Sequence, residues 1–81
     1  MSEGLLERIS IDPNVCFGKP TVRGHRIRVS LILDLLANGE SSEAILKEYP
    51  QLEEADILAC LAYAAELSRH NYHDIFLTKS A

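Results

Sequence analysis

The period of the hydrophobic residues changes near residue 30, and this change separates two kinds of local structure. Before it, apolar and polar side chains alternate in residues 9–11 and again in residues 24–29, which is typical of short, half-buried strands. After it, apolar residues recur every three or four positions, which is typical of helices. The sequence therefore predicts a mainly α domain that is preceded by a small N-terminal β-hairpin or short strands.

Turn-forming residues occur twice between the alternating stretches at residues 9–11 and 24–29. Residues 12–14 read Asp-Pro-Asn and residues 18–20 read Gly-Lys-Pro, and both triplets favour turns. The apolar residues 15–17 lie between them. We expect these three residues to form a short second strand.

The basic stretch before residue 30 has a two-residue period. Ile27 and Val29 fall on one side of an extended chain, and Arg26 and Arg28 fall on the other. This pattern predicts a half-buried strand with a basic outer side.

Three helices are expected after this strand, because capping and stop residues punctuate the helical pattern. The first helix is expected to start at Ser30 and to end at Gly39. The second is expected to start at Ser41 or Ser42 and to end at Pro50, and the third is expected over residues 53–70. The short second helix, the turn at Pro50 and the long third helix follow the first helix closely. This order predicts a trihelical helix-turn-helix arrangement.

The chain length allows one hydrophobic core. At 81 residues we expect a single domain over residues 1–81, with a globular core at about residues 6–70 and a tail at residues 71–81. A core this small is marginal, so association with a second copy is expected. The third helix is apolar around much more than one side, and the expected dimer interface consists of Leu58, Leu61, Ala65, Tyr72, Ile75 and Phe76.

Charge is distributed unevenly along the chain. The net charge is −4, but residues 1–30 carry +2 and residues 31–81 carry −6. Residues 19–28 contain four cations and no acid, so they form either a partner-binding surface or arginines that pair with the acidic body. The candidate protein- or nucleic-acid-binding residues are Lys19, Arg23, His25, Arg26 and Arg28.

The start of the third helix argues against one familiar way of binding DNA. A helix-turn-helix protein presents the first residues of its recognition helix to the major groove. Here those residues include Glu53, Glu54 and Asp56, which phosphates repel. Any contact with nucleic acid is therefore expected to use the basic strand instead.

No residue pattern in the sequence indicates catalysis, a metal site or a cofactor. No nucleophile and base, paired carboxylates or phosphate-binding glycine loop can be recognised, so we expect no enzyme activity. Cys16 and Cys60 are too few and too far apart for a disulfide framework or a zinc site, which favours the reducing cytoplasm. The longest apolar runs have about nine residues, far short of a membrane span of about 20, so no membrane anchor is expected.

Three segments of the sequence resemble a known family. They are residues 18–29 (GKPTVRGHRIRV), 36–41 (LANGES) and 49–52 (YPQL). Their order and spacing are similar to those of the domain of unknown function 433 family over about residues 6–66. The resemblance implies a homeodomain-like three-helix fold preceded by small β-strands, in a prokaryotic protein.

The family motif maps onto eight positions of this chain. They are Gly18, Lys19, Pro20, Arg23, Gly24, Arg26, Ile27 and Val29. Three other positions depart from the usual pattern, since His25 replaces a common Thr, Arg28 replaces a common Pro, and Glu53 replaces a Thr or Ser cap. The first two changes make the segment more basic, and the third removes a good N-cap.

The resemblance also implies a function. Many members of the family are thought to be antitoxins of the VapB kind, encoded beside PIN-like ribonuclease toxins. We therefore expect a homodimeric antitoxin whose Arg23, Arg26 or Arg28 enters the carboxylate-lined, metal-binding site of a PIN-like toxin. The alternatives are a helix-turn-helix autoregulator that binds duplex DNA and a structural dimer without a nucleic-acid role.

Overall fold

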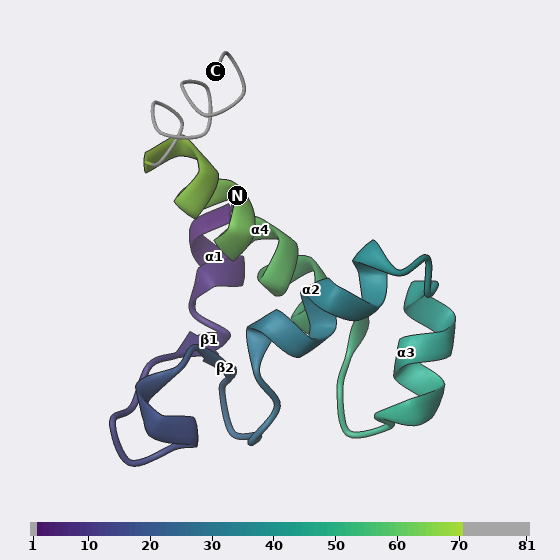
Figure 1. Ribbon diagram of the computed structural model, residues 1–81, viewed down its shortest axis with the longest axis horizontal. Coiled ribbons are helices and arrows are strands. Elements are labelled where there is room, and N and C mark those ends of the chain that lie inside the picture. The colour runs from purple at the N-terminus through teal and green to yellow at the C-terminus, as the bar shows by residue number, and fades with distance from the viewer. Residues whose placement is uncertain (1, 71–81) are drawn as a thin grey trace.

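A computed structural model of the chain describes residues 2–70, and the side chains of residues 4–69 (Figure 1). Its elements are α1 (Ser2–Leu6), β1 (Ile9–Ser10), the 3-10 turn η1 (Cys16–Gly18), β2 (Thr21–Val22), α2 (Val29–Ala37), α3 (Ser42–Glu48) and α4 (Glu54–His70). This confirms a mainly α domain with an N-terminal two-stranded hairpin. The predicted tail at residues 71–81 lies outside the described residues.

The hairpin is antiparallel and very short. Ile9 pairs with Val22 and Ser10 pairs with Thr21, so the ten residues between Ser10 and Thr21 must form a closed loop. The predicted strand at residues 15–17 is therefore wrong. In its place, Cys16 and Phe17 adopt left-handed backbone angles, with φ of 50° and 58°.

The predicted strand over residues 24–29 is also wrong as regular structure, although its burial pattern is correct. The segment contributes one isolated bridge, between Arg28 and Thr21. The backbone N–H of Val29 donates to the Pro20 carbonyl at 3.0 Å, and α2 begins at Val29 instead of after Ser30. Ile27 and Val29 are buried while Arg26 and Arg28 are exposed, as the alternation predicts.

Local capping sets the ends of the helices. The Ser41 hydroxyl accepts a hydrogen bond from the Ala44 N–H at 3.1 Å, which caps α3 as expected. Gly39 follows α2 with φ of 94°, a conformation that glycine adopts without strain. The helix α4 begins one residue after the predicted start, and an Asp56 carboxylate oxygen accepts from the Glu53 N–H at 2.8 Å. Asp56 thus supplies the cap that the Glu53 side chain does not.

The three long helices contact one another in pairs, which gives the expected trihelical arrangement. The core lies between them and the hairpin, and its most deeply buried side chains are Val22, Ile32, Ile45, Ile57 and Cys60. Figure 1 shows the hairpin and α3 at opposite ends of the domain. No helix within residues 2–70 is long and apolar enough to cross a membrane.

The first helix, α1, was not predicted. It packs along α4 (Figure 1), where Leu5 and Leu6 become partly buried. Five residues are too few to show a helical period, so only this tertiary contact reveals the element. Residues 2–6 are consequently packed on the helical part of the domain.

Candidate partner-binding surface

A loop that we call the arginine loop (residues 23–28) connects β2 to α2. It starts as a turn in which the His25 N–H donates to the Val22 carbonyl at 3.0 Å, and the Val22 N–H donates to the Ile27 carbonyl at 2.9 Å. Gly24 has φ of 81°, which a side chain would disfavour. Burial of Val22 and Ile27 fixes both ends of the loop, so its position is set by the core.

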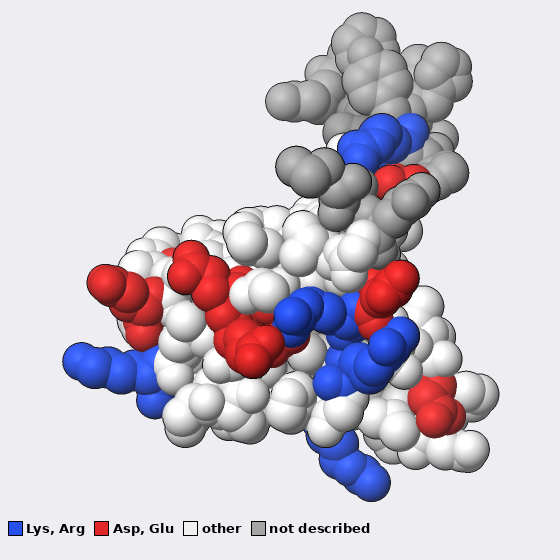
Figure 2. Space-filling model, turned by 180° about the vertical axis from the view of Figure 1, so that it is seen from behind, with Lys and Arg blue, Asp and Glu red and all other residues white. Residues whose placement is uncertain are grey.

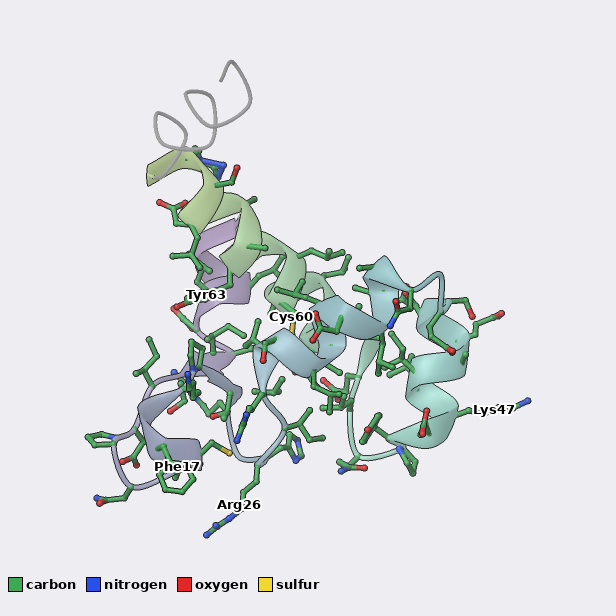
Figure 3. The ribbon with its side chains drawn as sticks, viewed as in Figure 1. Phe17, Arg26, Lys47, Cys60 and Tyr63 are labelled. Atoms are coloured by element: carbon green, nitrogen blue, oxygen red, sulfur yellow. The ribbon has the colours of Figure 1, made fainter. Side chains whose placement is uncertain are left out.

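The cations of this region are exposed and have no acidic partner among the described side chains. Four side chains are exposed to solvent, namely those of Lys19, Arg23, Arg26 and Arg28. None of them forms a salt bridge with any side chain among residues 4–69. Figure 3 shows Arg26 extending away from the body of the domain. Of the two sequence interpretations, pairing with the acidic body is therefore wrong for these four side chains within the described residues.

The structure separates the predicted basic residues into neighbouring but distinct surroundings. Arg23 and His25 line a polar recess of about 450 Å³. Arg26 lines a smaller recess of about 270 Å³ beside the hairpin, with His25 also at its edge. Lys19 instead lines an apolar groove against α2 and α4. Arg23, His25 and Arg26 thus lie around two recesses that share His25, whereas Lys19 lines a different groove.

Arg8 is a structural residue at the edge of the candidate site, and the sequence does not single it out. Its guanidinium donates to a Glu53 carboxylate oxygen at 3.0 Å and to an Asp56 carboxylate oxygen at 2.9 Å. These hydrogen bonds raise the pKa of Arg8 above its usual value, and the hydrogen bond to Asp56 makes the larger contribution. Its backbone carbonyl also accepts from the Arg23 N–H. Arg8 thus links the hairpin to the start of α4, because its two partners lie 45 and 48 positions further along the sequence.

We call Arg8, Glu53 and Asp56 the Arg8 cluster, and it forms part of the wall of the polar recess. The Asp56 side chain is only 8% exposed, whereas that of Glu53 is 71% exposed. Asp56 is therefore the buried centre of the cluster, satisfied by the Arg8 guanidinium and the Glu53 N–H. One sequence signal could have pointed to it, namely an acid three residues after the expected helix start at Glu53.

A buried thiol lies one helical turn beyond Asp56. Burial, and secondarily the negative charge of Asp56, raise the pKa of Cys60 to about 11. The thiol is consequently protonated near neutral pH and is a poor nucleophile. No cluster of three or more His, Cys, Asp or Glu side chains that could hold a metal ion occurs in the part of the chain that the structure describes.

The described part of the predicted dimer interface is exposed. Leu58 and Leu61 are 47% and 44% exposed, and Ala65 is exposed as well. Their spacing of three and four residues puts them on one side of α4, which we call the outer side of α4. Tyr72, Ile75 and Phe76 lie outside the described residues.

The charge pattern on one face of the domain is mixed. Figure 2 shows Lys and Arg side chains gathered near the middle of one face of the domain, with Asp and Glu side chains on both sides of them. A phosphate backbone requires a continuous positive surface, and this face does not provide one. Individual arginines on it can still make short-range contacts with carboxylates.

Comparison with known proteins agrees with the fold and with the motif. None of the curated proteins matches this sequence. A solved structure, of a DUF433 member protein from Anabaena variabilis ATCC 29413, is 26% identical and covers 98% of this chain and 74% of its own, with a TM-score of 0.69. The family profile described as protein of unknown function DUF433 matches residues 9–64. The chain therefore belongs to the DUF433 family.

Proposed function

We propose that this protein is a VapB-like antitoxin that binds and neutralises a PIN-like ribonuclease through its arginine loop. The observation that carries the proposal is the exposure of Arg23, Arg26 and Arg28 without any salt bridge to a described side chain. The resemblance of the sequence to antitoxin members of the family supplies the class of partner.

The chemistry of the loop suits a site lined by carboxylates. A guanidinium forms two parallel hydrogen bonds with one carboxylate, and such charge-assisted bonds are about twice as strong as neutral ones. Because the three arginines form no salt bridge with a side chain among residues 4–69, no salt bridge within that part of the chain has to break before they bind. An arginine in the metal site of a nuclease would displace the metal ion or exclude the RNA phosphate.

The same charges make a protein partner more favourable than DNA. The start of α4 holds Glu53, Glu54 and Asp56, and the net charge of the chain is −4. Both features oppose approach to a phosphate backbone. A small carboxylate-lined site can instead be contacted by Arg26 and Arg28 at short range, and such contacts do not require a positive surface around the two arginines.

The test is co-expression of the chain with the PIN-like reading frame that the proposal places beside its gene. We expect co-purification of the two proteins and rescue of growth from the toxin. Replacing Arg23, Arg26 and Arg28 together by Ala should abolish both, and the domain should still fold, because these side chains are exposed. Replacing the same three by Lys tests geometry, since lysine keeps the charge but loses the paired hydrogen bonds.

A matched control is available on α3. Lys47 is an exposed cation that points away from the domain at the end opposite Arg26 (Figure 3). Lys47→Ala should leave inhibition unchanged. Full inhibition by the triple Ala variant would contradict the proposed mechanism. Binding of a duplex by the chain, without binding of the toxin, would favour the autoregulator, and binding of neither would favour a structural dimer.

A further inference from the structure

Phe17 is the most exposed large apolar side chain among the residues whose side chains the structure describes. It is 91% exposed, and the next most exposed, Ile11 at 61%, belongs to the same loop between β1 and β2. An exposed ring gains none of the burial that makes aromatic residues favourable in a folded chain. Packing of the described domain therefore does not account for an aromatic residue at this position.

The backbone at Phe17 is also unfavourable for a residue with a side chain. Its φ is 58° and its ψ is 35°, which is the left-handed region that favours glycine. Cys16 and Gly18 on either side have positive φ as well. Backbone of this kind persists only where the surroundings fix it, and it concentrates at binding sites. Both the ring and its backbone therefore indicate a contact with another molecule.

Hydrogen bonds fix the turn that carries the ring. The Gly18 N–H donates to the Val15 carbonyl at 3.0 Å, and the Lys19 N–H donates to the Cys16 carbonyl at 3.1 Å. These two bonds enclose Phe17 in the sequence, so the turn holds its backbone before any partner binds. Such preorganisation lowers the conformational entropy that binding costs.

The turn lies against the arginine loop. The Cys16 thiol donates a weak hydrogen bond to the Arg26 carbonyl at 3.8 Å, and Val15 and Arg26 line the same recess of about 270 Å³. Figure 3 shows Phe17 and Arg26 at the same end of the domain. The ring and the guanidinium therefore belong to one surface, which we call the Phe17 surface (Phe17 and Arg26).

We propose that Phe17 is the apolar anchor of partner binding, and that its ring fills an apolar pocket of the protein whose carboxylates bind the arginine loop. This inference rests on the proposed antitoxin function and adds the residue that supplies the apolar part of the contact. The partner must accordingly present an apolar pocket beside its carboxylates.

The composition of the Phe17 surface is that of a protein interface. Interface cores are enriched in aromatic residues and arginine, and most of the binding energy comes from a few such side chains that fill pockets. Arg26 is exposed and forms no salt bridge with a side chain among residues 4–69. The Phe17 surface is therefore complementary to an apolar pocket with acidic surroundings.

The same surface is less suited to single-stranded nucleic acid. Proteins that stack bases on aromatic rings place those rings in a positively charged groove that follows the phosphates. Here Asp12 lines the recess beside Arg26, and the net charge of the chain is −4. Both features favour a protein partner.

The experiment measures the affinity of the full chain for the PIN-like protein of the co-expression test. Phe17→Ala should raise the dissociation constant at least about 30-fold, as expected of a residue that dominates an interface. Phe17→Leu keeps an apolar side chain and should raise it less than about tenfold. The matched control is Leu58→Ala on the outer side of α4, an exposed apolar residue whose loss should change the constant less than about threefold. Thermal unfolding of each variant reports its folding.

Salt separates the apolar contact from the charged one. The factor lost in Phe17→Ala should be the same at about 0.1 M and about 0.5 M NaCl, because burial of a ring involves no charge. The factor lost in Arg26→Ala should shrink at the higher concentration, because salt screens its attraction to carboxylates.

Four results would overturn the proposal. Unchanged affinity in Phe17→Ala would remove the anchor and leave the antitoxin function standing. An equal loss in Leu58→Ala would not single out Phe17. Binding of a single-stranded RNA of about 12 nucleotides that Phe17→Ala abolishes, with affinity for the PIN-like protein unchanged, would assign the ring to base stacking. A parent chain that does not bind the PIN-like protein at all would overturn the antitoxin function and this inference together.

Discussion

Arg8 and Arg26 both belong to the N-terminal third of the chain, but their surroundings differ completely. Two carboxylates hold the Arg8 guanidinium at 2.9 and 3.0 Å, whereas Arg26 has no acidic partner among the described residues. The Arg8 cluster fastens the hairpin to α4, and the arginine loop extends into solvent. Arginine content alone thus says little about the role of this region, because Arg8 is held by two internal salt bridges whereas Arg26 forms none with a described side chain.

The largest expected effect breaks the Arg8 cluster at its buried centre. Asp56→Ala removes the acceptor of both the Arg8 guanidinium and the Glu53 N–H. We expect the free energy of unfolding to fall by about 2–3 kcal/mol, measured by urea denaturation at neutral pH. Glu53→Ala is the matched control, and its 71% exposed side chain should cost less than about 1 kcal/mol. Equal losses for the two variants would contradict a buried centre at Asp56.

The alkaline stability of the domain provides a second measure of this region. The pKa of the Cys60 thiol is about 11 in the folded chain, whereas its ordinary value, which applies to the unfolded chain, is 9.0. Between these pH values the unfolded chain has released the proton and the folded chain has kept it. Stability should therefore fall as pH rises from about 9 to about 11, by about 2 kcal/mol.

Two variants separate the causes of this alkaline loss. In Cys60→Ala the free energy of unfolding, measured by urea titration, should fall less between pH 9 and pH 11 than in the parent chain, because the thiol is gone. Asp56→Asn removes the nearby negative charge, so thiolate absorbance should develop at a lower pH than in the parent chain. An unchanged thiolate titration would mean that burial alone sets the Cys60 pKa.

A direct comparison of the two arginines has a smaller expected effect. Arg8→Ala should lower the urea midpoint, because it leaves Asp56 without its cationic partner. Arg26→Ala should leave the free energy of unfolding within about 0.5 kcal/mol of the parent, yet weaken binding to the PIN-like partner that we propose. Opposite results would exchange the roles that we give to the two residues.

The smallest expected effect is stabilising and concerns the turn beside the arginine loop. Phe17→Gly relieves a left-handed backbone and removes a ring that is 91% exposed. We expect the free energy of unfolding to rise by about 0.5–1 kcal/mol, measured by thermal unfolding. Phe17→Ala keeps the Cβ atom and should give no such gain. A loss of stability in the glycine variant would show that the ring packs within its own chain.

Local signals in the sequence predicted the helices well. Ser41 caps α3 and Pro50 follows its end, and the long apolar helix starts within one residue of its expected position. These features depend on residues only a few positions apart. The strand predicted at residues 15–17 failed for the opposite reason, since pairing of Ser10 with Thr21 leaves those residues in the connecting loop.

The candidate site was predicted in part. The run of cations correctly indicated exposed arginines, because no acid lies near them in the sequence. The Arg8 cluster could not be predicted, because its partners are 45 and 48 residues away. The apolar groove was also invisible in the sequence, since residues from three separate segments of the chain line it.

The packing of α1 against α4 has a consequence for synthesis of the protein. The chain emerges from the ribosome N-terminus first, so residues 2–6 and the hairpin appear long before the helix that covers them. A hairpin of one strand pair, with only two paired residues in each strand, is too small to be stable alone. The basic N-terminal third must therefore wait, without its final partners, until residues 54–70 have been made. A nascent chain that stalls after α3 would carry its arginines on an unfolded segment.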